Sequence, residues 1–579
     1  ALIVCGVVTR LALLLIGWPH GNSEEGTMGL EAMHILLRGE HPIYLYGQRY
    51  MGVGEAYLGA LAFRIFGVST VALRLGMVAC YAAFLLGVFW LAHLLYSRRV
   101  ALVSLVALIL GTPFLVKIEL LADGGKAETM ALGALMFALA TWLALPQSAS
   151  SKAPRWRRPL RASGLVGWGV MAGFGLYTYT IIAPFALTTG LLLWLACRRT
   201  LRRELGGWAV ALPLAGLLVG LLPVIVYTLT SPLAENPIAV FWSLHQSLNP
   251  GGVSGWYLLA RQVDGTLLYT LPTVTGLANL YPVEALPLYG PPGPAMIAAV
   301  VIGGAWSLGY LALLGVATYR PWVALRTSRA RRWVTRPTDQ TSQRDTSADT
   351  SADTSAQSPH STAWQETQSL ARLLLALTAW LTIAAYMFSA TAANNPHSGR
   401  YMIGLLVVVP AVLWPLVDST PRGEGGKRES RGHTWAASLR SVWRPAALAL
   451  LGVSLLVGVV SVAQTMPDEV AANGRDARFT QALLSRGVTR LYADYWTCDL
   501  INFETRERLI CAVVDQYGRP GLTRYRPYYA AVRADPDAPY VLVPGSIIER
   551  TFLLHAAQSH QRYTEQSLDG HDVFTPVAP

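Results

Sequence analysis

Long apolar runs separated by short polar segments recur along the first 465 residues of the chain. Most runs are about 20 residues long, which is the length of α-helix that crosses a ~30 Å hydrocarbon core. Beyond residue 465 the apolar runs shorten and alternate with helical patterns. The pattern predicts a polytopic α-helical membrane domain, residues 1–465, followed by a small α/β domain, residues 466–579. It predicts about eleven transmembrane helices, at residues 1–18, 70–96, 100–117, 127–146, 164–181, 182–197, 207–229, 295–318, 369–390, 400–417 and 444–465.

Two of these assignments depend on local signals. The chain opens inside an apolar run without an initiator Met, so we expect residues before Ala1 to be missing. Because residues 1–18 lead directly into a charged loop, we interpret them as a retained first helix rather than a cleaved signal peptide. Residues 164–197 contain Pro184, which is compatible with a kink or with a turn. We assign two helices there.

Charge supports a membrane protein and gives its orientation. Only 14% of residues are charged, whereas soluble domains have about 25%, and 53% are apolar. The net charge of +12 is unevenly distributed, because one set of loops contains 24 Lys and Arg and the opposite set only seven. This asymmetry is the positive-inside bias, so the charge indicates topology and not a nucleic-acid partner. The cytoplasmic set is 97–99, 147–163, 198–206, 319–368 and 418–444, and the external set is 19–69, 117–126, 230–294 and 391–400.

The segments between and after the helices differ in character. The inner loop 319–368 contains a repeated Asp-Thr-Ser-Ala motif and is predicted to be disordered. The external loop 19–69 is long and aromatic, and the external loop 230–294, which has many Pro, Gly and Trp residues, is expected to form a packed cap. We expect the chain to lie in a bacterial inner membrane, with the C-terminal segment outside. The short apolar runs of this segment alternate with helical patterns. Cys498 and Cys511 share this domain and can form a disulfide in an oxidising compartment.

The α/β domain is predicted from five short segments. Phe479–Ser485 and Ile547–Gln558 have helical patterns. The expected strands are Arg490–Tyr495, Leu509–Val514 and Tyr540–Val543.

The first candidate for chemistry is the acidic pair Glu24-Glu25, a few residues beyond the first helix. A carboxylate here can act as a general base at the membrane surface. The alternative is structural, because Ser23 can cap a helix whose first-turn acids complement its dipole. Both interpretations are compatible with a carboxylate that faces a cavity.

A second charged group lies in another external loop and contains Lys117, Glu119, Asp123, Lys126 and Glu128. Charges near a bilayer are costly, so they persist through pairing, solvation or function. A lysine ammonium suits a phosphate group, whereas a lysine that snorkels to the interface is an equal alternative. Because the topology places this group on the side of Glu24 and Glu25, we expect the two to line one cavity.

A third group precedes the tenth predicted helix, at residues 394–401, and contains His397 and Arg400. A guanidinium can bind phosphate through two nitrogens. An interfacial Arg-Tyr anchor, formed by Arg400 and Tyr401, is the alternative interpretation. We expect Arg400 at the rim of the cavity.

Several motifs together resemble a known superfamily. The first loop contains Glu24-Glu25, His34-Ile35-Leu36, Gly39-Glu40, Pro42, Tyr46-Gly47-Gln48-Arg49-Tyr50-Met51-Gly52 and Glu55-Ala56-Tyr57-Leu58. Later segments contain Asp123-Gly124-Gly125-Lys126-Ala127-Glu128-Thr129, Gly399-Arg400-Tyr401 and Tyr492-Ala493-Asp494-Tyr495-Trp496. Over nearly the whole chain these motifs resemble an uncharacterised branch of the bacterial GT-C glycosyltransferases, the superfamily of protein O-mannosyltransferases and lipid A aminoarabinose transferases.

The resemblance implies an activity and its partners. A polyprenyl-phosphate sugar donor would enter from the bilayer, and the sugar would pass to a glycan, lipid or protein acceptor on the outer face, with inversion. Glu24 or Glu25 would be the catalytic base. The implied substrate-binding residues are Gln48, Tyr50, Glu55, Lys117, Asp123, Lys126, Glu128, His397 and Arg400.

The resemblance also implies that some members bind a divalent metal. Mg or Mn would be held here by Glu24 and Asp123. In relatives the acidic pair is commonly Asp-Glu, so Glu24 takes the Asp place with a side chain one methylene longer. Gly26 stands where Ala is usual, and we expect little consequence from that difference.

Two other functions fit a polytopic chain. A proton-coupled transporter would use carboxylates at membrane depth, but the apolar spans contain few acids and no internal repeat. A GT-C-like scaffold without activity would keep the fold alone. The glycosyltransferase is the hypothesis that the motifs favour.

Overall fold

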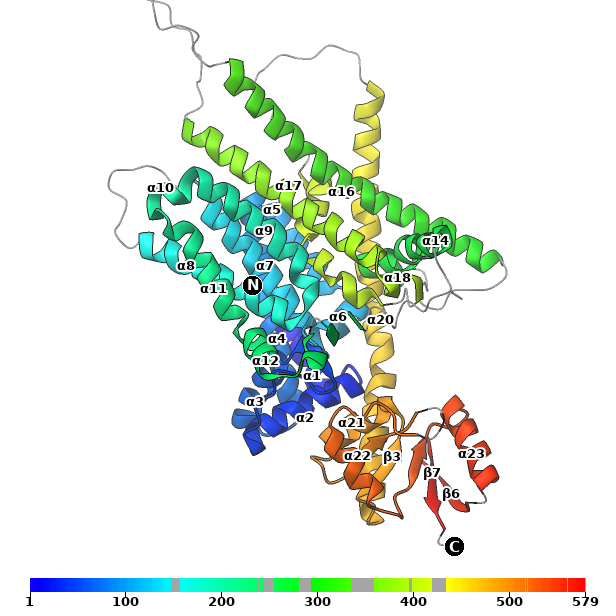
Figure 1. Ribbon diagram of the computed structural model, residues 1–579. Helices are drawn as coiled ribbons and strands as arrows, with labels where there is room; N and C mark the ends of the chain where they lie inside the picture. The colour runs from blue at the N-terminus through cyan, green and yellow to red at the C-terminus, as the bar shows by residue number, and fades with distance from the viewer. Residues whose placement is uncertain are drawn as a thin grey trace, which may run out of the picture.

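The structure is a computed structural model of the 579-residue chain, shown in Figure 1. The residues that it describes are 1–146, 157–237, 239–240, 242–243, 255–280, 293–334, 359–394, 398–418, 434–515, 517, 519–559 and 561–577. The Asp-Thr-Ser-Ala repeat of the predicted inner loop lies outside these ranges.

A bundle of apolar helices forms the larger part of the molecule, and its core lies between α4, α7, α9, α17 and α19. The first helices of the bundle are α1 (Leu2–Ile16), α4 (Thr70–Leu95), α5 (Arg98–Leu110), α6 (Pro113–Leu120) and α7 (Lys126–Ala144). They are followed by α8 (Arg157–Thr178), η1 (Thr180–Ile182), α9 (Ala183–Ala196), η2 (Cys197–Leu201), α10 (Arg202–Leu205), α11 (Trp208–Gly220), α12 (Leu222–Thr230) and η3 (Leu233–Glu235).

The second half of the bundle contains shorter pieces between long helices. Its elements are α14 (Trp256–Asp264), η4 (Gly265–Thr270), α15 (Leu271–Thr275), η5 (Leu277–Asn279), α16 (Pro294–Val334), α17 (Pro359–Met387), α18 (Ala390–Asn394), η7 (Gly399–Leu406) and α19 (Val409–Val417). Helix α14 and the turns after it belong to the segment 230–294, which is predicted to be external, and they pack on α16, α17 and α18.

Within the described residues, five helices are long and apolar enough to cross a membrane: α4, α7, α16, α17 and α20 (Thr434–Ser485). Two bent pairs of helices reach that length together. The remaining predicted spans contain α8 or the shorter apolar stretches Leu2–Ile16, Thr180–Ala196 and Leu405–Val417. The count of eleven and the in–out order stay predictions.

The predicted span 100–117 is broken rather than continuous. Helices α5 and α6 meet at an angle of 85°. Gly111 has a φ of 38°, and the Thr112 side chain accepts a hydrogen bond from the Leu115 amide at 3.1 Å, with Pro113 in the first turn. A capping threonine followed by proline starts a new helix, so the chain turns there and brings residues 118–126 into the interior.

The pair within residues 164–197 is two helices, as predicted. Helix α8 ends at Thr178, a 3₁₀ turn follows, and Pro184 lies in the first turn of α9. A proline in that position lacks only an amide that the helix does not use.

The predicted first external loop folds as α2 (Ser23–Arg38), a short hairpin and α3 (Gly54–Phe66). The Asn22 side chain caps α2 by accepting a hydrogen bond from the Glu25 amide at 2.9 Å. This corrects the expectation that Ser23 is the cap, because Ser23 is already inside the helix. The hairpin strands are β1 (Tyr44–Leu45) and β2 (Gln48–Gly52).

The C-terminal domain carries a five-stranded sheet in the order β4-β3-β5-β7-β6. Strands β4 (Ile510–Val513) and β5 (Tyr540–Leu542) both run parallel to β3 (Arg490–Ala493), as their helical connections predict. The helices are α21 (Tyr495–Glu504), α22 (Arg526–Arg533) and α23 (Ile547–Ser559). An antiparallel hairpin, β6 (Tyr563–Leu568) and β7 (His571–Pro576), was not predicted.

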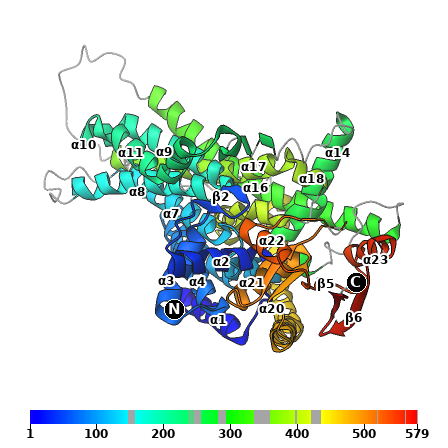
Figure 2. The ribbon, with the colours of Figure 1, turned by 60° about the horizontal axis from the view of Figure 1, so that its bottom comes forward.

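Two features attach this domain to the rest of the chain. Helix α20 runs without interruption from the bundle into the domain and ends at Ser485, so no linker separates them at residue 466 (Figure 1). The domain also packs against the first external loop, where α21 lies on α2 (Figure 2). A disulfide joins Cys498 of α21 to Cys511 of β4.

Candidate active site

Glu24 and Glu25 point in different directions from the start of α2. Glu25 is fully buried, and its oxygens accept hydrogen bonds from Nε and Nη2 of Arg74, each at 2.7 Å. Arg74 also donates to the Pro19 carbonyl at 2.9 Å. Glu25 therefore anchors α2 to α4, and Glu24, on the adjacent face, lines a cavity.

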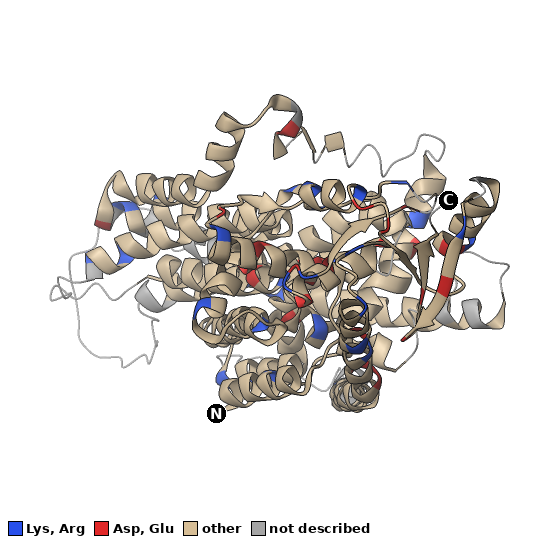
Figure 3. Cartoon of the chain, turned by 90° about the horizontal axis from the view of Figure 1, so that it is seen from below, with Lys and Arg blue, Asp and Glu red and all other residues tan. Residues whose placement is uncertain are grey.

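This cavity has a volume of about 490 Å³ and lies between the first loop and the helical bundle. Seen from the side of the C-terminal domain, several acidic and basic residues gather near the middle of the molecule (Figure 3). The cavity brings together the predicted residues Glu24, Gln48, Tyr50, Asp123, Lys126 and Arg400. Aromatic residues complete its wall: Tyr401, from the motif that contains Arg400, and Tyr179 and Tyr386, which sequence reasoning did not single out.

Asp123 and Lys126 form a close ion pair in the wall of the cavity. Lys126 Nζ lies 2.6 Å from Asp123 Oδ2, and both side chains are almost fully buried. Among the described residues, the other Asp123 oxygen, Oδ1, has no hydrogen-bond partner. A buried acceptor without a partner is costly, so a donor group of a bound substrate would relieve that cost.

Glu24 lies between two guanidinium groups. Glu24 Oε2 is 3.7 Å from Arg400 Nη1, and Glu24 Oε1 is 3.9 Å from Arg524 Nη2. At these separations the attraction orients the carboxylate without a direct hydrogen bond. Arg400 comes from η7 of the bundle, whereas Arg524 comes from the C-terminal domain. Arg524 was not predicted, since nothing in its local sequence marks it.

Two predicted residues lie behind the cavity wall rather than in it. Glu55 accepts hydrogen bonds from the amides of Gly124 and Gly125, at 3.0 and 2.8 Å, and so holds the turn before Lys126. Burial, together with the nearby carboxylates of Glu128 and Asp123, raises the pKa of Glu55 well above its ordinary value. Glu128 is also buried behind the wall, against Gly54.

Two further predicted residues are not brought to the cavity. Lys117 Nζ pairs with Glu469 of α20 at 2.6 Å and does not line the wall. Glu119, from the same predicted group, is paired with Arg10 of α1 at 2.6 Å. His397 lies outside the described residues.

The donor set does not fit the implied metal. A divalent cation at Glu24 and Asp123 would need both carboxylates, but cationic side chains already flank each of them. In the part of the chain that the structure describes, no group of three or more His, Cys, Asp and Glu side chains can hold a metal ion. Mg²⁺ prefers an octahedral set of oxygens.

The surroundings of Gly26 contradict the expectation that Gly in place of Ala has little consequence there. A Cβ at this position would lie 2.5 Å from the backbone of Asp499 in α21, which is far inside van der Waals contact. One turn away, Gly29 would meet the ring of Phe503 at 2.6 Å. The absence of both side chains lets α21 approach α2, so the difference from Ala has a structural consequence.

No protein-family model matches the sequence, and a comparison with curated proteins gives no match. The structure is similar to ArnT from Cupriavidus metallidurans bound to undecaprenyl phosphate, with 13% identity, a TM-score of 0.42, and coverage of 100% of this chain and 98% of ArnT. It is also similar to the archaeal oligosaccharyltransferase AglB from Archaeoglobus fulgidus, in complex with an inhibitory peptide and a dolichol-phosphate. That similarity has 12% identity, a TM-score of 0.47, and coverage of 99% of this chain and 73% of AglB.

Proposed function

We propose that this chain is an integral membrane glycosyltransferase that moves a sugar from a polyprenyl-phosphate donor to an acceptor at the cavity beside Glu24. The observation that carries the proposal is the composition of that cavity. The Glu24 carboxylate, an acid–lysine pair and an arginine lie around one space of about 490 Å³. Transfer from a lipid phosphate requires a base for the acceptor hydroxyl and cations for the leaving phosphate.

In the proposed reaction, Glu24 accepts the proton of the acceptor hydroxyl while the hydroxyl oxygen attacks the anomeric carbon. The bond between that carbon and the phosphate oxygen breaks, and the electron pair leaves with the polyprenyl phosphate. Arg400 and Lys126 bind the departing phosphate, since charge develops there in the transition state. Direct displacement inverts the anomeric centre. Asp123 accepts a hydrogen bond from the sugar or the acceptor.

A second, apolar cavity supports a lipid-linked donor. It has a volume of about 610 Å³ and lies among α5, α16, α19 and α20. Its wall includes Leu405 and Leu406 of η7, the element that supplies Arg400 to the polar cavity. A prenyl chain would occupy the apolar cavity while its phosphate reaches Arg400. Such a donor, a glycan, lipid or protein acceptor and the bilayer are the partners of this proposal.

The proposed site lies on the outer face of a bacterial inner membrane, with the C-terminal domain outside. Two observations agree with that orientation: the charge asymmetry of the loops, and the packing of the C-terminal domain against the first external loop. The purified chain should release polyprenyl phosphate and form a glycosylated acceptor when supplied with polyprenyl-phosphate sugars. Proton-coupled uptake of a solute into proteoliposomes, without any transfer of sugar, would favour a transporter instead.

A further inference from the structure

Arg524 is buried in the C-terminal domain yet contacts the wall of the candidate active site. Its side chain is only 1% exposed, and it lies between β4 and α22. Arg524 Nε donates to the Tyr495 hydroxyl at 2.9 Å, which fixes the guanidinium from within the domain. The ring of Tyr495 lies 5.3 Å from the guanidinium carbon.

The other end of the guanidinium reaches the first external loop. Arg524 Nη1 donates to the Tyr46 carbonyl at 3.2 Å. With the Gln48 amide turned to satisfy its hydrogen bonds, the amide oxygen accepts from Nη2 and Nη1 of Arg524 at 3.1 and 3.2 Å. The backbone approaches closely as well, because a Cβ on Gly47 would lie 3.4 Å from Arg524 Cα.

Two of the residues that Arg524 approaches, Gln48 and Glu24, line the cavity. Arg524 itself does not line it. We propose that Arg524 is a positioning residue that holds Glu24 and Gln48 at the cavity wall from the C-terminal domain, so that the site is complete only while the domain is docked. A planar guanidinium is suited to this role, because its donors have fixed directions and can serve several acceptors together.

The docking surface around Arg524 supports this role. Thr27 donates a buried hydrogen bond to Asp499 Oδ2 at 2.9 Å, three residues along α2 from Glu24. Together with the close approach at Gly26 and Gly29, this contact fixes the start of α2 against α21. A displacement of the domain would therefore move the helix that carries Glu24.

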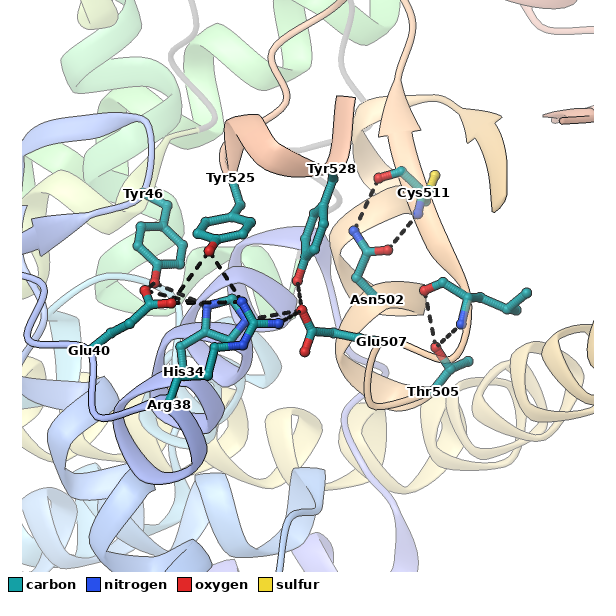
Figure 4. Close-up of polar contacts among 11 residues, drawn as sticks. His34, Arg38, Glu40, Tyr46, Asn502, Thr505, Glu507, Cys511, Tyr525 and Tyr528 are labelled. Carbon is teal, nitrogen blue, oxygen red and sulfur yellow. Dashed lines mark hydrogen bonds and ion pairs between the residues drawn. The ribbon is translucent and has the colours of Figure 1, made fainter. Parts of the chain in front are cut away.

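A polar cluster extends the same surface, shown in Figure 4. Glu507 of the domain accepts hydrogen bonds from His34 Nε2 at 3.2 Å and from the Tyr528 hydroxyl at 2.8 Å, and it pairs with Arg38. On the other side, the Tyr46 hydroxyl donates to Glu40 at 2.6 Å. The cluster spans both chain segments, so the domain is held at more than one point.

The kinetic test of this inference rests on the proposed function, and a second measurement does not. Arg524→Gln should lower kcat about 10²-fold, since a displacement near 1 Å at an active site can have that effect. KM for the donor should change less than about threefold, because Arg524 does not touch the cavity. Arg524→Lys should recover little of the rate, since one ammonium cannot serve Tyr46, Gln48 and Tyr495 together.

Arg526→Gln is the matched control. It removes the same charge as Arg524→Gln, but from an exposed side chain two residues further along the chain. It should leave kcat unchanged. Hydrogen exchange supplies the measurement that needs no activity. Amides in residues 22–27 and 44–52 should exchange faster in Arg524→Gln than in the wild type, and at the wild-type rate in Arg526→Gln.

Two results would overturn the inference. One is a folded Arg524→Gln or Arg524→Lys variant with the wild-type kcat, and the other is unchanged exchange in both segments. If Arg524→Gln fails to fold, Tyr495→Phe, which removes only the support behind the guanidinium, takes its place with the same expected direction. If the wild-type protein transfers no sugar but Arg524→Gln still exchanges faster in both segments, the proposed function is contradicted while the positioning role of Arg524 stands.

Discussion

Glu25 and Arg74 form a buried two-point ion pair, and this pair decides which of two adjacent acids faces the cavity. Both oxygens of Glu25 accept from Arg74 at 2.7 Å, and the two side chains are 0% and 3% exposed. Both oxygens of Glu25 are thereby occupied in the contact between α2 and α4. Glu24 is left as the acid that can exchange a proton with a substrate.

Removal of one member of this pair should destabilise the protein. Arg74→Leu leaves the Glu25 carboxylate buried without its cation, which typically costs about 3–5 kcal/mol. We expect a lower thermal unfolding temperature in detergent for Arg74→Leu. Glu24→Gln, whose side chain is partly exposed, should unfold near the wild-type temperature. Equal stability of Arg74→Leu and the wild type would show that the pair does not hold α2.

Acid should release the C-terminal domain from the first loop through Glu507. Burial alone would raise the pKa of Glu507, but hydrogen bonds from His34, Tyr528 and Arg38 outweigh it and lower the pKa to about 2. Because this value lies below the ordinary value of about 4.3, ionised Glu507 stabilises the docked state at neutral pH. That contribution is lost as the pH falls from about 5 through about 2.

Asp499 acts in the opposite direction, so the two groups can be separated. Burial raises its pKa to about 6, against the Thr27 hydrogen bond. Its contribution is therefore present below about pH 4 and is lost as the pH rises through about 6. Hydrogen exchange in α2 should accelerate below about pH 4 in the wild type, relative to the intrinsic rate, and Glu507→Gln should remove most of that change. The same acid response in Glu507→Gln would assign it to another group.

Gly309 offers a way to test the apolar cavity as a prenyl site. It lines that cavity, and a Cβ there would meet no atom within 4 Å, so Gly309→Phe fills the space without an initial clash. KM for an undecaprenyl-linked donor should rise about tenfold, equivalent to about 1.4 kcal/mol of binding. A geranyl-linked donor, whose chain is too short to fill the cavity, should be used as before.

Gly315 provides the control for this substitution. It lies on the same helix, has equally open space at Cβ and does not line the cavity. Gly315→Phe should leave both donors unaffected. An equal loss with the long and the short donor in Gly309→Phe would contradict the prenyl assignment.

The sequence predicted a shared cavity for three of the residues that line it, Glu24, Asp123 and Arg400, from the predicted topology. Glu24, Asp123 and Arg400 come from three segments predicted to be external, and charges on one side of a membrane tend to share a solvated space. The sequence did not distinguish Glu24 from Glu25. Adjacent residues on a helix point about 100° apart, and only the position of Arg74 in the packed bundle decides which acid is engaged.

The β6–β7 hairpin and the break between α5 and α6 each have a local signal in the sequence, whereas the contact of Arg524 has none. Asp569-Gly570 between two alternating runs is a strong hairpin signal, and it marks the turn of β6 and β7. Thr112-Pro113 marks the break between α5 and α6. By contrast, Arg524 meets Gln48 only through a contact across 476 positions of sequence, which no local pattern reveals.

The role of Glu24 is tested most directly by turnover of a polyprenyl-phosphate sugar, with wild-type and Glu24→Gln protein compared at matched folded concentration. The substitution nearly preserves volume and removes the base, so the rate of transfer should fall by roughly 10²–10⁴-fold, with donor binding retained. A Glu24→Gln variant that keeps most of the wild-type rate would contradict the account.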